Sequence, residues 1–75
     1  MSIHGAYQMN ETQIIRIGDA LRLTGESRSA AYRKIKSGEW PQPVAIGKRA
    51  IGFVASEIYA LNQKRISASR KSIQT

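Results

Sequence analysis

The 75-residue sequence predicts one small α+β domain that is mostly helical and has a winged helix–turn–helix architecture. Three observations lead to this fold class. Two short helical segments flank a glycine-containing turn at residues 24–27. Two apolar stretches follow, separated by a turn typical of a β-hairpin. A last helical segment comes after them. We therefore expect three short helices and a two- or three-stranded hairpin wing.

The first predicted helix covers residues 19–24. Gly25 ends it, because a glycine just beyond a helix readily adopts the left-handed cap conformation. Before this helix, Ile14, Ile15 and Ile17 form a β-branched run. Such a run predicts a brief strand.

The second predicted helix covers residues 28–37. Ser27 is its expected N-cap, since a serine hydroxyl can accept a hydrogen bond from an unpaired amide of the first turn. Gly38 is expected to end this helix. Ala31 and Ile35 are four residues apart, so they share one face and should pack inward.

The wing is predicted after an extended connector at residues 40–43, whose two prolines cannot donate to a ladder. Residues 44–46 and 51–53 are the expected strands, and residues 47–50 are the expected turn between them. We assign two aromatic side chains to the core: Trp40 and Phe53.

The last predicted helix covers residues 57–66, with Ser56 as its N-cap. Ile58 and Leu61 should lie on its inner face. The polar segment 67–75 is expected to be a basic, disordered tail. The domain would thus span residues 13–66, after a flexible N-terminal arm at residues 1–12.

The charge distribution favours a polyanionic partner. The chain carries 12 Lys and Arg against 5 Asp and Glu, a formal net charge of +7. Six of the basic residues and one acidic residue fall within residues 28–49. Nucleic acid is the commonest polyanion in a cytosol, so double-stranded DNA is the expected partner.

The predicted second helix presents an outer face suited to the major groove. Residues 28–38 contain no acidic residue, whereas a merely solvated face usually mixes both signs. Arginine can contact guanine in a bidentate manner, and lysine reaches phosphates. The hairpin turn carries two further cations that could reach the minor groove or its phosphates. The candidate DNA-binding residues are Ser27, Arg28, Ser29, Tyr32, Arg33, Lys36, Lys48 and Arg49.

The composition argues against an enzyme. The chain has no cysteine and one histidine, His4, and its five carboxylates are scattered. No spacing suggests a shared acid–base pair, a metal site or a phosphate-binding loop, so we expect no catalysis, no metal and no cofactor. No secretory signal or membrane span is recognisable. A cytoplasmic, nucleoid-associated protein is the expectation.

Five segments together resemble the AlpA family of small regulators from prophages and genomic islands. The resemblance covers residues 15–66, and its segments are TGESRS at 24–29, YRKIKSG at 32–38, WPQP at 40–43, GKRAIGF at 47–53 and SEI at 56–58. This family is related to MerR-like winged helix–turn–helix proteins and to phage excisionases. The resemblance implies DNA binding through Ser27, Arg28, Ser29, Tyr32, Arg33 and Arg49.

The chain also departs from the family pattern. Glu26 stands where the family often has an apolar residue, and Ala31 and Lys34 replace larger apolar residues. Leu61 stands where tryptophan is frequent. These departures predict a thinner core and a modest stability.

Three functions remain open at this point. The first is a sequence-specific transcriptional regulator of a prophage or genomic island. The second is an excisionase, or recombination directionality factor, that binds attachment-site DNA and assists an integrase. The third is a protein-interaction module that binds an integrase or a response regulator. Integrase and RNA polymerase are the candidate protein partners, and a monomer that binds DNA in tandem copies is the expected state.

Overall fold

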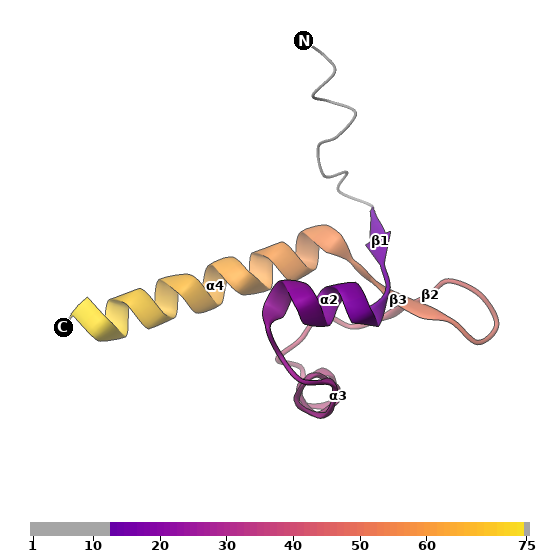
Figure 1. The fold of residues 1–75 in the computed structure, drawn as a ribbon, viewed down its shortest axis with the longest axis horizontal. Coiled ribbons are helices and arrows are strands. Elements are labelled where there is room, and N and C mark those ends of the chain that lie inside the picture. Colours follow the sequence, from indigo (N-terminus) through magenta and orange to yellow (C-terminus); the bar gives the residue numbers. More distant parts are fainter. Residues whose placement is uncertain (1–12, 75) are drawn as a thin grey trace, which may run out of the picture.

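The computed structural model describes the backbone of residues 13–74 and the side chains of residues 13–71. Its architecture confirms the predicted fold class: three helices and a small antiparallel sheet, as a winged helix–turn–helix requires (Figure 1). The predicted N-terminal arm lies outside the described residues. In chain order the elements are β1 (Ile14–Ile15), α2 (Ile17–Thr24), α3 (Arg28–Ser37), β2 (Val44–Ala45), β3 (Ile51–Val54) and α4 (Ala55–Gln74).

The sheet has three strands in the order β1-β3-β2, and both pairings are antiparallel. Ile15 is opposite Phe53 on one side of β3, and Val44 is opposite Gly52 on the other. The predicted strand near residue 14 and the predicted hairpin are therefore both confirmed. The hairpin strands are joined by an exposed loop that projects away from the rest of the fold (Figure 1).

Helix α2 begins at Ile17, two residues before the predicted start. Arg16 has an extended backbone, and its carbonyl accepts the amide of Ala20, which closes the first helical turn. Ile17 is thus the first helical residue and not part of the strand as the β-branched run suggested. Its partly buried side chain packs against the core, and this packing outweighs the weak helical preference of isoleucine.

Helix α3 has the predicted bounds and the predicted caps at both ends. Ser27 accepts a hydrogen bond from the amide of Ala30 at 3.2 Å. Gly38 has a φ of 86°, and its amide donates to the carbonyl of Ile35. A left-handed glycine likewise ends α2, since Gly25 has a φ of 73°. The turn of the helix–turn–helix and the end of α3 are thus both set by local sequence.

The start of α4 corrects the prediction that Ser56 is an N-cap. The helix begins at Ala55, directly after the last residue of β3. The amide of Ala55 donates to the carbonyl of Gln13 at 2.8 Å, so the residue just before β1 satisfies the first amide of the helix. A side-chain cap one residue later is therefore not what begins this helix.

The end of α4 corrects the prediction of a disordered tail. The helix continues beyond Ile66 to Gln74, through residues expected to be unstructured. No glycine or proline interrupts residues 67–74, and Lys71 lies in the last turn, where a cation interacts favourably with the helix dipole. As a result α4 extends well away from the sheet (Figure 1).

The core is small and lies between the sheet and the helices. Trp40 and Phe53 are both buried, as predicted, and their rings meet edge to face with centroids 5.5 Å apart. Ala31 and Ile58 are also fully buried, and Leu61 packs against this cluster. The inner faces predicted for α3 and α4 are therefore confirmed. Among residues 13–71, the hydrophobic side chains of the buried core are Ala20, Ala31, Trp40, Phe53, Ala55 and Ile58.

Gly52 occupies a position in β3 where no side chain fits, and Gly52→Ala is expected to destabilise the sheet by about 1–3 kcal/mol. A Cβ there would lie 2.5 Å from Ile14 Cγ2, 2.8 Å from Ile46 Cδ1 and 2.9 Å from the carbonyl oxygen of Ile15. The backbone oxygen cannot move without parting β1 from β3. Urea unfolding of the two proteins measures the loss. An unchanged midpoint would contradict the close packing of these strands.

Candidate nucleic-acid interface

The six candidate residues at the N-cap and on helix α3 are all exposed. They are Ser27, Arg28, Ser29, Tyr32, Arg33 and Lys36. Tyr32 is 44% exposed although it is a large aromatic residue. We call these exposed side chains together the α3 face. Ser29, Arg33 and Lys36 lie opposite Ala31 on the helix, whereas Ser27 and Arg28 lie at its N-terminal end.

The cations of the α3 face have no acidic partner. Within the residues whose side chains are described, none of Arg28, Arg33 and Lys36 forms an ion pair. The first turn of α3 also has no acidic residue, so the positive end of its helix dipole is not offset there. An unpaired basic surface of this kind attracts phosphate groups.

The wing tip carries the other two candidates, Lys48 and Arg49. Both are exposed, and neither is paired with a carboxylate among residues 13–71. The amides of Ile46 and Gly47 donate to the carbonyl of Ala50, which closes the turn that displays them. The structure does not bring these two cations onto the α3 face, because the hairpin loop and α3 lie in different parts of the fold (Figure 1).

Ser27 lies at the boundary of the α3 face and already has a structural role. Its hydroxyl oxygen accepts the amide of Ala30, so that oxygen fixes the start of the helix. The hydroxyl hydrogen is still available to donate to a phosphate. Ser27 therefore differs from Arg28 and Ser29, whose side chains have no hydrogen bond within the described residues.

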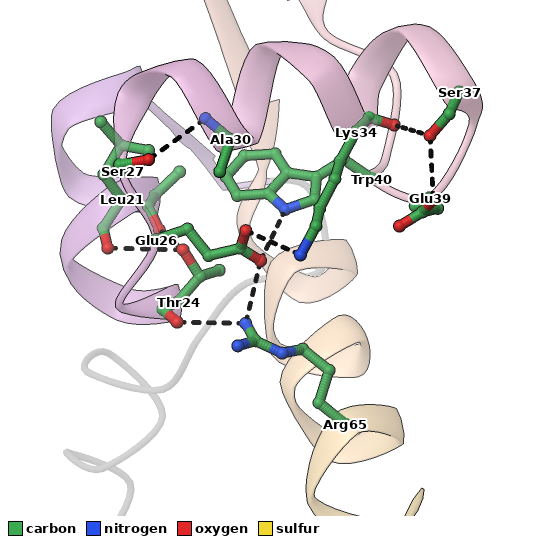
Figure 2. A network of polar contacts seen from close by, with 11 residues as sticks. Leu21, Thr24, Glu26, Ser27, Ala30, Lys34, Ser37, Glu39, Trp40 and Arg65 are labelled. Carbon is green, nitrogen blue, oxygen red and sulfur yellow. Dashed lines mark hydrogen bonds and ion pairs between the residues drawn. The ribbon is translucent and has the colours of Figure 1, made fainter.

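The fourth basic residue of α3, Lys34, points inward and not to the α3 face. Its ammonium lies 2.9 Å from Glu26 Oε1, and its side chain is 29% exposed. Glu26 Oε2 is 3.3 Å from Trp40 Nε1, which donates to it, and 3.2 Å from Arg65 Nη1 (Figure 2). Glu26 and Lys34 thus form an ion pair, and both are departures from the family pattern. Reasoning from the sequence missed this network, since no local signal links residue 26 to residue 65.

Helix α4 contributes to the same region by binding the end of α2. Asn62 Nδ2 donates to the carbonyl of Leu23 at 2.9 Å, and Arg65 Nη1 donates to the carbonyl of Thr24 at 3.1 Å. These are carbonyls of the last helical turn, which have no partner within the helix. Two side chains of α4 therefore hold the C-terminal end of the first helix of the helix–turn–helix.

The pKa of Glu26 reflects this environment. Burial alone would raise it, but hydrogen bonds from Lys34 and Trp40, together with the charges of Lys34 and Arg65, hold the pKa below its ordinary value of 4.5. A carboxylate with a lowered pKa in the folded state stabilises the fold at pH values above its ordinary pKa. That contribution disappears as the pH falls through the lowered value.

We therefore expect stability to fall with pH more steeply in the wild type than in Glu26→Gln between about pH 5 and pH 2. The remaining carboxylates titrate in both proteins, so the difference isolates Glu26. Thermal unfolding at successive pH values measures it. Parallel pH profiles would show that the folded state does not favour the ionised form.

Within the described residues there is neither a metal-binding cluster nor a helix that could span a membrane. No group of three or more His, Cys, Asp or Glu comes together among them in a way that could hold a metal ion. None of the helices within residues 13–74 has both the length and the apolar character that a membrane span requires.

A match to a family model shows which family this chain belongs to. The model of the family described as prophage CP4-57 regulatory protein (AlpA) matches residues 13–66. The chain belongs to the AlpA family. The match includes the whole sheet, α2, α3 and α4 as far as Ile66. The family is one of prophage regulatory proteins, and the match confirms the resemblance found in the sequence.

A phage protein is also similar to this AlpA chain. It is the uncharacterized protein ORF88 of Enterobacteria phage P4, which is 29% identical over 63 residues. The matched region is 84% of this chain and 72% of the phage protein. No solved structure matches the chain.

Proposed function

We propose that this AlpA protein is a sequence-specific DNA-binding regulator of a prophage or genomic island, without catalytic activity. Helix α3 would enter the major groove, and the turn at residues 47–50 would contact the minor groove or its phosphates. The observation that carries the proposal is the α3 face: its cations are exposed and have no acidic partner among the residues with described side chains.

The chemistry of the α3 face divides between base readout and phosphate contact. Arg33 lies in the middle of α3, where a guanidinium can reach O6 and N7 of guanine. Arg28 and Ser29 lie in the first turn, whose free amides and positive dipole favour a phosphate. Lys48 and Arg49 would add contacts that strengthen binding to any duplex.

The proposal is tested by selecting duplexes from a random library with the purified protein and footprinting it on element DNA. That DNA should carry both the attachment site and the integrase promoter. Enrichment of one sequence is the expected result. If no sequence is enriched and duplexes bind alike, sequence-specific regulation is excluded.

The footprint also distinguishes the remaining roles. Protection confined to the promoter supports a transcriptional regulator, for which RNA polymerase is the candidate partner. Several adjacent protected sites in the attachment arm support an excisionase that works with an integrase. Capture of an integrase that survives nuclease treatment, without any footprint, favours a protein-interaction module. Binding as tandem monomers, and a location on the nucleoid, follow only from the first two outcomes.

Two lysines of α3 provide a matched pair of variants. Lys36 is exposed on the α3 face, whereas Lys34 is paired with Glu26. Lys36→Met is expected to reduce the slope of log affinity against log salt concentration by about 0.9, the value for one lost phosphate contact. Lys34→Met should leave that slope unchanged on a scrambled duplex. Fluorescence anisotropy at several salt concentrations measures both, and equal losses of slope would contradict the assignment of the two faces.

A further inference from the structure

Glu26 is a charged side chain in a surface turn that is nevertheless almost fully buried. Its side chain is 7% exposed, although the two residues on either side of it, Gly25 and Ser27, are exposed. A carboxylate removed from water costs several kcal/mol unless it is paired and hydrogen-bonded. Here both oxygens have donors: Oε1 faces Lys34, and Oε2 faces Trp40 and Arg65.

The three donors belong to three different parts of the chain. Lys34 lies in α3, Trp40 in the connector to β2, and Arg65 in α4. Arg65 also binds the carbonyl of Thr24 at the end of α2. Figure 2 shows the Glu26 carboxylate at the meeting point of these side chains. The carboxylate therefore links α3 and the connector to α4, and Arg65 adds the C-terminal end of α2 through the carbonyl of Thr24.

The apolar attachment of α3 is thin by comparison. Ala31 is the only residue of α3 that is fully buried, and Ile35 is only partly buried against the core. An alanine buries little apolar area, so packing constrains the rotation and tilt of α3 weakly. The polar contacts at Lys34 supply a constraint that Ala31 and Ile35 do not.

We propose that Glu26 is a positioning residue, which fixes the orientation of α3 against α4 and thereby the ability of the α3 face to discriminate between DNA sequences. This inference rests on the proposed function. It goes further by assigning specificity to a side chain that is too buried to touch DNA. It also explains why Lys34, unlike Arg33 and Lys36, is unavailable to phosphates.

The test compares Glu26→Gln with Asp19→Asn, which also removes one negative charge. Asp19 pairs with Arg22 within α2, and both side chains are at least half exposed. Two duplexes serve as probes at one salt concentration: the sequence selected by the wild-type protein and a scrambled version of it.

Glu26→Gln is expected to weaken binding to the selected duplex about tenfold, the loss of one well-placed base contact. Its affinity for the scrambled duplex should not fall, because that affinity depends on net positive charge. Asp19→Asn should leave the ratio of the two affinities unchanged. If Glu26→Gln and Asp19→Asn change the ratio equally, the proposal is wrong.

A second measurement does not depend on DNA. The amide resonances of residues 28–37 and the indole N–H resonance of Trp40 are recorded for the free wild-type protein and both variants. Glu26→Gln is expected to shift amides along α3 as well as the indole, whereas Asp19→Asn should shift neither. Unmoved α3 amides in folded Glu26→Gln overturn the proposal. If the wild type selects no duplex, the proposed function fails, and these resonances still decide the positioning role.

Arg65→Met provides the same test if Glu26→Gln does not fold. It removes the contacts from Arg65 to Glu26 and to the carbonyl of Thr24, but it leaves the pair of Glu26 with Lys34. A fall in the affinity ratio together with shifted α3 amides supports the proposal. A folded Arg65→Met protein with an unchanged ratio and unchanged amides contradicts it.

Discussion

Phe53→Ala is expected to cost about 3–5 kcal/mol of the free energy of unfolding, the range for removing a buried aromatic side chain. Phe53 is fully buried, lies in the central strand β3 and packs edge to face on Trp40. A 75-residue chain has a total stability of only about 4–11 kcal/mol. Much or all of that stability would therefore be lost. Denaturant unfolding followed by circular dichroism measures the effect.

Ile51→Ala is the matched control for this prediction. Ile51 lies in the same strand but is 38% exposed, so truncating it should cost about 1 kcal/mol or less. A similar loss for Ile51→Ala and Phe53→Ala would mean that the core does not depend on the aromatic pair.

Arg33→Ala is expected to weaken binding to the selected duplex by about 1–3 kcal/mol, or roughly 5- to 150-fold. Arg33 is exposed on the α3 face, it has no acidic partner among the described side chains, and its guanidinium can read a guanine. Loss of a base contact should also relax the sequence preference at one position. Competition with single-base variants of the selected duplex measures both effects.

Arg22→Ala controls for the loss of charge. Arg22 lies on α2, outside the α3 face and the wing, where it pairs with Asp19. It should change the affinity for selected and scrambled duplexes little and in the same proportion. If Arg33→Ala behaves in the same way as Arg22→Ala, the α3 face is not the surface that reads the sequence.

Glu26 shows what a departure from a family pattern can do in the folded protein. An acidic residue at an apolar position predicted a thinner core. In the structure the same residue binds Lys34, which is a second departure, and the side chains of Trp40 and Arg65. The two departures compensate each other, because each supplies the charge that the other needs on burial.

The outward direction of Ser29, Arg33 and Lys36 followed from helical periodicity. With Ala31 and Ile35 inward, these three side chains had to be outward, and they are exposed. The same reasoning could not separate Lys34 from its neighbours, since its direction depends on where Glu26 lies. How the wing tip is placed relative to α3 likewise depends on the packing of β3 against the helices.

The sequence determined the features that arise from neighbouring residues. Ser27 caps α3, Gly25 and Gly38 end the two helices, and residues 44–54 form a hairpin, because each of these structures is stabilised by groups only a few positions apart. Tertiary structure determined the features whose partners are distant in the chain. Ala55 begins α4 because its amide meets Gln13, and the Glu26 carboxylate can be buried because α4 brings Arg65 to it. Hydrogen bonds and ion pairs of this kind form only after the chain has folded, so no local pattern could indicate them.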